Sequence, residues 1–360
     1  MTVRVIIAGG GTGGHLFPGI AIAEAFRIRD SQNQILFLGT SNPIEVSTLS
    51  GKGFDHESIV AEGLKGRGIW RQIRSLFKIP VGMWQALRIM WRFHPDIIVG
   101  LGAYASGPVA LAAWLTGKKL VIHEQNTLPG FTNRVLGRLA HRILVSFPDT
   151  GGVFPPSRTV ITGNPLRREL LESRSDEKAI ELFTVLVVGG SQGAHAVNRA
   201  VIEALDHLES PDRMAFIHQT GPKDATWVAE AYERRHVTAT VKPFFVDMAG
   251  PYHAADLVVC RAGATTVSEL MALGKPAIFI PFRLAANNHQ ELNARHVANA
   301  GGGEVILEQD VNGAVLAGRL NHYASNPKAL QNMAERTRAL ARPNAADVIV
   351  DECERLVNES

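Results

Sequence analysis

Short apolar runs rich in β-branched residues alternate along the chain with longer stretches of helical periodicity. The first run covers residues 3–8, a glycine-rich turn follows at 9–14, and a helical pattern follows over 20–28. Strands that are apolar throughout are buried on both faces, as in parallel sheets covered by helices. The pattern predicts an α/β fold. Further apolar runs occur at residues 34–39, 96–100, 120–123, 142–145 and 159–162.

The same pattern begins again near residue 184. An apolar run over 184–188 leads into a second glycine-rich turn at 189–194, followed by a helix that carries Asn198. We therefore predict two Rossmann-like domains, residues 1–163 and 164–344, with the charged stretch 171–181 as the expected connection. Ligands of such folds bind at the carboxyl ends of the strands, which predicts a central cleft between the two sheets. Later runs occur at residues 214–218, 238–241, 257–260, 277–280 and 304–307.

Composition narrows the class of protein. A net charge of +3 over 360 residues argues against a dedicated nucleic-acid binder. Cys260 and Cys353 form no CxxC motif, which suits a reducing compartment. The first ten residues lack the apolar region of a signal peptide. Residues 97–117 carry no charge but contain several glycines and Pro108, so we interpret them as strand, loop and buried helix rather than a membrane span.

The first glycine-rich turn ends in His15 and fits the pattern G-x-G-x-x-G between a strand and a helix. Such a turn lets backbone N–H groups approach an anion at the helix N-terminus. NAD and ATP are disfavoured as ligands, because residues 38–42 offer no carboxylate for a ribose and the turn lacks the Gly-Lys-Ser/Thr of a P-loop. His15 either bonds to its own loop or faces the ligand as a general base.

Polar residues follow two further strands. His123, Glu124, Gln125 and Asn126 come at a strand's carboxyl end, where buried polar groups need partners. They either satisfy one another or contact a ligand, and we favour ligand contact. Residues 260–270 predict a helix N-terminus that cradles phosphate, with Arg261 as counter-charge and Glu269 accepting hydrogen bonds from a ribose diol. The alternative for this segment is an ordinary helix cap.

These motifs occur together in one order, and in that order the chain resembles the MurG family of bacterial glycosyltransferases from residue 3 to about residue 300. The resemblance implies a GT-B fold in which UDP-GlcNAc binds mainly to the second domain, and a C-terminal helix, 345–360, that packs back on the first. Ala103 stands where the family usually has a glycine, which puts the conformation of the acceptor loop in question. The motifs are Gly10-Gly11-Thr12-Gly13-Gly14-His15, Pro18-Gly19, His123-Glu124-Gln125-Asn126, Gly163-Asn164-Pro165 with Arg167, residues 189–194, Arg261 through Glu269, and His289-Gln290 with Asn293-Ala294.

The resemblance also implies the chemistry. The enzyme would be an inverting hexosyltransferase that moves N-acetylglucosamine from UDP-GlcNAc to the C4 hydroxyl of undecaprenyl-pyrophosphoryl-muramyl-pentapeptide, converting lipid I to lipid II in peptidoglycan synthesis, and would thereby serve cell shape and division. No metal and no other cofactor is expected, so helix N-termini and Arg261 would meet the diphosphate charge. The expected donor contacts are Thr12, Gly13, Gly14, Asn126, Arg167, Ser191, Gln192, Phe245 or its neighbour Phe244, Arg261, Ala264, Thr265, Thr266, Val267, Ser268, Glu269 and Gln290.

His15 is the first candidate for the base, and Glu124 is the second, either as base or as the group that orients the base. Two alternatives from other classes remain open at this point. A UDP-GlcNAc 2-epimerase would keep the fold and the donor without a lipid acceptor. A non-catalytic nucleotide-sugar-binding module would recruit partners to the membrane.

Residues 63–95 carry seven basic residues and no carboxylate, and they hold Trp70, Trp84 and Trp91. Cations among aromatic residues suit the surface of an anionic membrane. We expect Trp70, Arg71, Arg74, Phe77 and Lys78 to be outermost, whereas 84–91 could instead pack on the domain. The prediction is a peripheral protein on the cytoplasmic face of the bacterial inner membrane, with other cell-wall and division proteins as partners and no nucleic acid.

Overall fold

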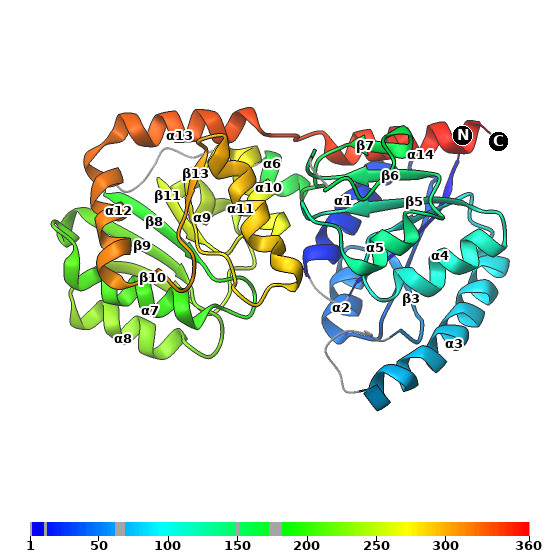
Figure 1. The fold of residues 1–360 in the computed structure, drawn as a ribbon, viewed down its shortest axis with the longest axis horizontal. Coiled ribbons are helices and arrows are strands. Elements are labelled where there is room, and N and C mark those ends of the chain that lie inside the picture. The colour runs from blue at the N-terminus through cyan, green and yellow to red at the C-terminus, as the bar shows by residue number, and fades with distance from the viewer. Residues whose placement is uncertain (1, 11–12, 62–68, 149–150, 173–181, 360) are drawn as a thin grey trace. The chain divides into compact units, whose positions relative to one another are not determined.

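A computed structural model describes residues 2–10, 13–61, 69–148, 151–172 and 182–359, with residues 69–78 described by their backbone alone. The chain divides into two compact units (Figure 1). The first unit holds Met1–Arg167 together with Pro343–Ser360, and the second holds Arg168–Arg342. The boundaries drawn from the sequence at residues 163 and 344 lie close to these.

The first unit is built on a seven-stranded parallel sheet in the order β3-β2-β1-β4-β5-β6-β7. Alternate residues of β1 enter two different cores: Val5 and Ile7 face one cluster, and Ile6 and Ala8 face the other. Helices therefore cover both faces of this sheet, as the apolar runs predicted. The strands are β1 Arg4–Ala8, β2 Gln34–Gly39, β3 Asp55–Ser58, β4 Ile97–Gly100, β5 Lys119–Glu124, β6 Arg142–Val145 and β7 Thr159–Ile161.

The helices of the first unit include the last one in the sequence. Figure 1 shows α14, in red, beside the first unit's sheet, and its Ile349, Cys353 and Leu356 are buried in the same core as α1. Arg29 of α1 also pairs with Asp351, 2.7 Å away. The α-helices of this unit are α1 Gly13–Arg29, α2 Pro43–Gly51, α3 Ile69–Phe93, α4 Ser106–Leu115, α5 Phe131–Leu136 and α14 Ala345–Asn358.

The second unit repeats this architecture with six parallel strands in the order β10-β9-β8-β11-β12-β13. The strands are β8 Phe183–Val188, β9 Met214–Gln219, β10 Thr238–Lys242, β11 Leu257–Cys260, β12 Ala277–Phe279 and β13 Gly303–Val305. The α-helices are α6 Arg168–Glu172, α7 His195–Ala204, α8 Ala225–Arg234, α9 Ala249–Ala254, α10 Ala264–Leu273, α11 His289–Asn299, α12 Gly313–Ser325 and α13 Pro327–Ala339. The prediction of two Rossmann-like parallel-sheet units is confirmed.

Two details differ from the prediction. Strand β3 was not predicted, because Asp55–Ser58 is a polar strand at the edge of the sheet and lacks an apolar run. Residues 97–117 form strand, loop and helix as expected, but the end of α4 is not buried: Trp114 and Leu115 are exposed. Within the described part of the chain, no helix has the length and apolar character needed to cross a membrane.

Candidate functional site

The first-unit site lies where strands β1, β4 and β5 end. The strand order places β1 beside β4 and β4 beside β5, so Ala8, Gly100 and Glu124 end their strands along one edge of the sheet. Helix α1 begins at the same edge, and its first residues, Gly13 and Gly14, are exposed. The N–H groups of a first helical turn lack partners within the helix, which suits an anion. Thr12, expected to share this contact, lies outside the described residues.

A carboxylate that sequence analysis missed packs under this glycine turn. Glu45 of α2 is buried, and its Oε2 accepts a hydrogen bond from Thr40 Oγ1 at 3.1 Å. A Cβ added at Gly10 would come within 1.9 Å of Glu45 Oε1, and one at Gly39 within 1.8 Å. The search of residues 38–42 found no acid because Glu45 comes from the helix that follows. Its burial leaves it supporting the turn rather than facing a ribose.

Glu124 organises the loop after β5. Its side chain is 2% exposed, and both oxygens accept hydrogen bonds. Oε1 accepts from the backbone and side-chain amides of Asn126, at 3.0 and 3.3 Å. Oε2 accepts from the Gly130 N–H at 3.0 Å and from Asn133 Nδ2 at 2.9 Å. This saturation favours a scaffold role for Glu124 over the role of base.

His15 contacts Gln125 rather than Glu124. His15 Nδ1 lies 3.1 Å from Gln125 Oε1, and Gln125 Nε2 lies 3.1 Å from His123 Nδ1. His123 Nε2 in turn lies 3.0 Å from the carbonyl oxygen of Gly163. Burial lowers the pKa of His123 to about 4, and the nearby His15 adds to this, while the bond to Gly163 acts in the opposite direction. The expectation that Glu124 orients the base is therefore replaced: Gln125 occupies that position.

Asn133 of α5 packs against the loop after β4. Gly102 has φ +88°, and a Cβ there would lie 2.6 Å from Asn133 Nδ2. This close approach requires glycine at 102. Ala103 is not among the residues with positive φ, so its backbone takes an ordinary conformation and needs no glycine. Alanine at position 103 is therefore compatible with the conformation of this loop.

The second-unit site begins with the glycine-rich turn after β8. Gly193 has φ +76°, and a Cβ at this position would come within 2.1 Å of the Thr220 carbonyl oxygen. Ser191 and Gln192 are exposed at the tip of the turn. Gln219 joins the turn to the next loop, since its Nε2 donates to Gly190 O at 3.2 Å and its Oε1 accepts from the Phe245 N–H at 2.9 Å.

Phe244 is better exposed for a ligand than Phe245. Phe245 is 8% exposed and its N–H is bonded to Gln219, whereas Phe244 is 47% exposed. Of the two neighbours named from the sequence, the structure therefore favours Phe244 as the ring that meets a base. Gln219, which fixes this loop, was not identified from the sequence.

The start of α10 presents two hydroxyls. Thr265 Oγ1 and Ser268 Oγ are buried and have no hydrogen-bond partner among the described residues. Glu269 is also buried, and its Oε2 accepts from the Tyr252 hydroxyl at 2.9 Å. Ala264 and Val267 are buried, and the Val267 N–H donates to Gly263 O at 2.9 Å, which leaves Val267 no group to offer a ligand. The structure therefore lends no support to Val267 as a donor contact, which stays a prediction.

Arg261 is engaged in an ion pair and does not stand as an isolated counter-charge. Its Nη1 lies 2.6 Å from Glu308 Oε2 and donates to the carbonyls of Ile280 and Pro281 at 3.0 and 3.2 Å. The guanidinium also lies 5.3 Å from the ring centroid of Phe282. Arg261 therefore anchors the loop after β12, and its role as counter-charge to a diphosphate stays a prediction.

Two further expected contacts belong to different units. Arg167 belongs to the first unit, where its guanidinium lies 4.8 Å from the ring centroid of Phe17 in α1. Gln290 of α11 accepts a hydrogen bond from the Phe282 N–H at 2.9 Å and so holds the same loop as Arg261. Thr266 is half-buried in the first turn of α10.

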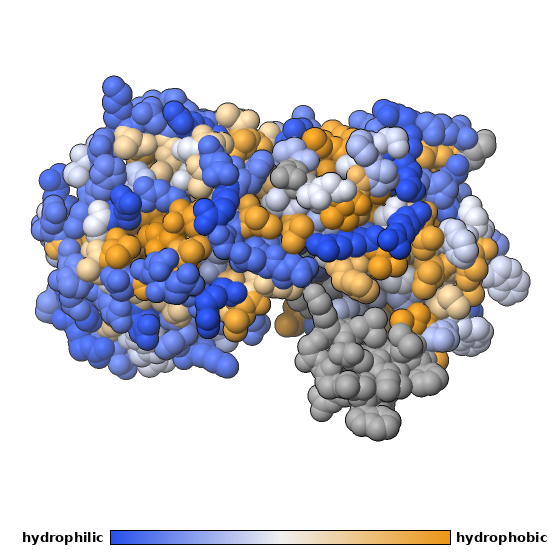
Figure 2. Space-filling view, in the orientation of Figure 1, coloured by the Kyte–Doolittle hydropathy of each residue, from blue (hydrophilic) through white to orange (hydrophobic). Residues whose placement is uncertain are grey.

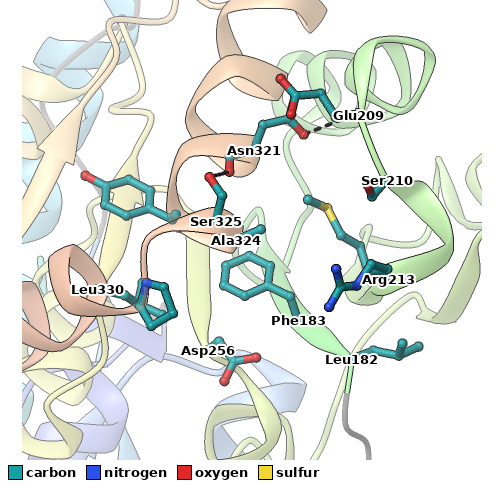
Figure 3. Close-up of a pocket in the computed structure, with 13 residues that line it drawn as sticks. Leu182, Phe183, Glu209, Ser210, Arg213, Asp256, Asn321, Ala324, Ser325 and Leu330 are labelled. Atoms are coloured by element: carbon teal, nitrogen blue, oxygen red, sulfur yellow. Dashed lines mark hydrogen bonds between the residues drawn. The ribbon is translucent and has the colours of Figure 1, made fainter.

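A separate cavity of about 410 Å³ lies at the amino-terminal ends of β8, β9 and β11, and Phe183, Arg213, Asp256 and Asn321 are among its lining residues (Figure 3). Asp256 accepts a hydrogen bond from the Thr184 N–H, and Asn321 from the Glu209 N–H. Both side chains are thus bonded to backbone N–H groups, and we assign no ligand to this cavity. Over the described ranges, no group of three or more His, Cys, Asp and Glu side chains could hold a metal ion. Metal independence stays a prediction.

One face of α3 and the end of α4 are apolar and exposed. Trp84 is 60% exposed and Trp91 is 80% exposed, so these tryptophans do not pack on the domain; Ala86, Ile89 and Met90 do. Trp114, missed in the sequence, is 56% exposed. Figure 2 shows orange and pale residues gathered where α3 and α4 lie. Trp70, Arg71, Arg74, Phe77 and Lys78 have side chains outside the described part.

Comparison with known proteins covers both units. The family description "Glycosyltransferase family 28 N-terminal domain" matches residues 5–145, and "Glycosyltransferase family 28 C-terminal domain" matches residues 184–349. A relative from Syntrophus aciditrophicus (strain SB), named "UDP-N-acetylglucosamine--N-acetylmuramyl-(pentapeptide) pyrophosphoryl-undecaprenol N-acetylglucosamine transferase", is 45% identical over 359 residues, covering 99% of each chain. The crystal structure of Acinetobacter baumannii MurG matches with a TM-score of 0.80 and 32% identity, covering 98% of this chain and 99% of that one.

The chain belongs to the MurG family. The family's GT-B fold accounts for the two parallel-sheet units, and the chain is a glycosyltransferase of family 28. A structure titled as a putative UDP-N-acetylglucosamine 2-epimerase from Listeria monocytogenes also matches, with a TM-score of 0.73 and 14% identity, covering 100% of this chain and 98% of that one. Identity at that level shows the shared fold alone. The fold therefore does not distinguish transferase from epimerase, whereas the 45% identical relative favours the transferase.

Proposed function

We propose that this enzyme transfers N-acetylglucosamine from UDP-GlcNAc to the C4 hydroxyl of the muramyl sugar in undecaprenyl-pyrophosphoryl-muramyl-pentapeptide, which converts lipid I to lipid II in peptidoglycan synthesis. The observation that carries this proposal is 45% identity along 99% of both chains to a relative with the name of that transferase. The similarity spans both units, which supports an enzyme over a binding module.

The second-unit site supports binding of the donor diphosphate. Thr265 Oγ1 and Ser268 Oγ are buried hydroxyls without a partner in the described chain, and they stand in the first turns of α10. Phosphate oxygens would accept from these hydroxyls and from the N–H groups of the helix N-terminus. Arg261 is paired with Glu308, 2.6 Å away. The hydroxyls and the helix N–H groups would therefore bind the diphosphate to a greater extent than the sequence suggested. The N-terminal dipole of α10 also favours a diphosphate leaving group without a metal.

The first-unit site supports a base for the acceptor hydroxyl. In the transfer, the C4 oxygen of the acceptor attacks the anomeric carbon of N-acetylglucosamine from the face opposite UDP. The bond from that carbon to the diphosphate oxygen breaks, and UDP leaves with the electron pair. Nε2 of His15 takes the hydroxyl proton, which is general-base catalysis. Glu124, with four hydrogen bonds to its carboxylate, holds the loop that carries Gln125 and Asn126.

Release of UDP tests this proposal. With UDP-GlcNAc and a short-chain lipid-linked muramyl-pentapeptide, we expect UDP to accumulate, and we expect the same rate in the presence of EDTA. With UDP-GlcNAc alone, release should stay near the background. Acceptor-independent conversion of UDP-GlcNAc to its C2 epimer would favour the epimerase alternative, and loss of activity in EDTA would contradict metal independence.

The apolar face of α3 supports peripheral attachment to the cytoplasmic face of the inner membrane. Val81, Trp84, Arg88 and Trp91 follow one another at spacings of three and four residues, so they share one face of the helix. Arg88 also lies 5.9 Å from the ring centroid of Trp84. Exposed tryptophan with a nearby cation is typical of an interfacial helix on anionic lipid. Binding of other cell-wall and division proteins, and the absence of nucleic-acid binding, stay predictions.

Replacing Trp84 and Trp91 together by Glu should weaken binding to vesicles that contain anionic lipid. Each charge near such a surface is worth about 1 kcal/mol, so two added carboxylates alone weaken binding by about 30-fold. Vesicle flotation measures this effect. The double variant Ile28→Glu/Val315→Glu is the control, since both of those residues are exposed but lie on α1 and α12. Equal flotation of the two double variants would contradict a membrane surface on α3, and turnover of a soluble acceptor should be unchanged in both.

A further inference from the structure

A line of hydrogen-bonding side chains runs from a backbone carbonyl to His15. Its members are Gly163 O, His123, Gln125 and His15, with heavy-atom distances of 3.0, 3.1 and 3.1 Å. His123 and Gln125 are fully buried, and Gln125 Nε2 also lies 3.4 Å from the carbonyl oxygen of His123. Because neither group is exposed, each must bond within the protein. The contacts of this line therefore decide which atoms donate and which accept.

The carbonyl at one end of this line fixes which atom donates and which accepts in each of its hydrogen bonds. A carbonyl oxygen only accepts, so Nε2 of His123 carries the hydrogen. Burial keeps the ring neutral near pH 7, because it lowers the pKa of His123 to about 4. Nδ1 of His123 therefore holds a lone pair and must accept, which requires the NH2 group of Gln125 to face it. The Gln125 oxygen then faces His15 and accepts from Nδ1–H.

We propose that Gln125 and His123 are positioning residues that hold His15 in the tautomer with hydrogen on Nδ1. The basic lone pair of His15 is thereby fixed on Nε2. This inference rests on the proposed function in one respect: the proton that Nε2 takes is that of the acceptor hydroxyl. When Nε2 takes the proton, the Nδ1–H bond to Gln125 becomes charge-assisted and strengthens. The amide supplies this support without a negative charge beside the ring.

The same line accounts for Gln at position 125. A carboxylate there would present only acceptors, and its second oxygen would face the lone pair of His123 Nδ1. An apolar side chain would leave Nδ1 of His123 buried without a donor and would remove the bias on His15. Only an amide donates to one neighbour and accepts from the other in this arrangement. The Gly163 carbonyl, 40 residues from His123 in sequence, thus sets the state of His15 through two side chains.

Nitrogen NMR of ¹⁵N-histidine-labelled full-length protein tests the proposal directly. The two ring nitrogens of His15, assigned by comparison with His15→Asn, should show Nδ1 protonated and Nε2 unprotonated near pH 7. The tautomer is measured on the wild-type protein, and the variant serves only to assign the His15 signals. A His15 ring with hydrogen on Nε2 would overturn the proposal, whatever the activity.

Gln125→Met keeps the length of the side chain and removes both hydrogen bonds. We expect the His15 signals to move toward a mixture of tautomers, and kcat to fall by about 10-fold to 100-fold, with the donor KM within threefold. A wrong tautomer in a catalytic histidine costs up to about 10⁴ in kcat, and loss of the bias costs less than its reversal. Gln331→Met on α13 is the control and should change neither quantity.

The two claims fail in different ways. If wild-type enzyme makes no disaccharide, the proposed function fails while the tautomer can still be measured. If wild-type enzyme is active but Gln125→Met leaves both the His15 signals and kcat unchanged, the positioning role is wrong and the function stands.

Discussion

Replacing His15 by Asn should lower kcat by about 10² to 10⁴ and leave the donor KM within threefold. General-base catalysis contributes about this factor, and Asn keeps a polar side chain that can still bond to Gln125 Oε1 but cannot take the proton. The ring of His15 meets Gln125 at 3.1 Å from the first turn of α1, so the substitution removes chemistry rather than packing. Steady-state kinetics with varied donor and a saturating short-chain acceptor measures both constants.

His322→Asn is the matched control for this experiment. His322 lies near the end of α12 in the second unit, with its ring centroid 5.0 Å from that of Tyr323. Turnover of this variant should equal that of the wild type. A His15→Asn enzyme with normal kcat and a raised donor KM would assign His15 to donor binding and would exclude it as the base.

Replacing Glu124 by Gln should lower both stability and turnover. Four N–H donors point at this carboxylate, and an amide would turn its own NH2 toward two of them. Leaving buried donors without acceptors costs about 1 to 3 kcal/mol each. In a unit of this size, 1 kcal/mol lowers Tm by about 2 to 4 °C, so a loss of several degrees is expected.

Thermal unfolding and turnover together separate the two roles of Glu124. If Glu124 is a scaffold residue, Tm and kcat of the Glu124→Gln variant should fall together, because the loop carrying Gln125 and Asn126 loses its anchor. If Glu124 is the base, kcat should fall at constant Tm. Glu203→Gln is the control, since Glu203 is exposed and pairs with Arg199 at 3.5 Å, a contact worth little. A Glu124→Gln protein with unchanged Tm would contradict the scaffold role.

The sequence predicted the sheets well, because strands buried on both faces must be apolar throughout. It also predicted that polar residues after those strands would share an edge, since the carboxyl ends of parallel strands lie together. It failed for β3, a polar edge strand, where nothing in Asp55–Ser58 signals a strand. It failed for Trp114 and Leu115 because an uncharged stretch does not reveal which of its residues face water.

Partner choice within the site could not be predicted, because it depends on tertiary contacts. Arg261 pairs with Glu308, and no local pattern links the two residues. Glu45 reaches the glycine turn from the next helix, so a search limited to strand ends misses it. His123 and Gln125 were identified as ligand contacts, whereas the structure buries both, with Gln125 bonded to His15 and to His123. The sequence motifs thus predicted which residues lie at the site, and the hydrogen bonds of the structure indicate the role of each.

The most direct test of the central claim is the structure of the product. After reaction with UDP-GlcNAc and a short-chain lipid-linked muramyl-pentapeptide, mass spectrometry and proton NMR of the purified product report its composition and anomeric linkage. We predict a disaccharide with N-acetylglucosamine joined to the C4 oxygen of the muramyl sugar in the β configuration, inverted from the α linkage of the donor. An α linkage would contradict the mechanism built on His15, and the absence of any disaccharide would contradict the proposed function itself.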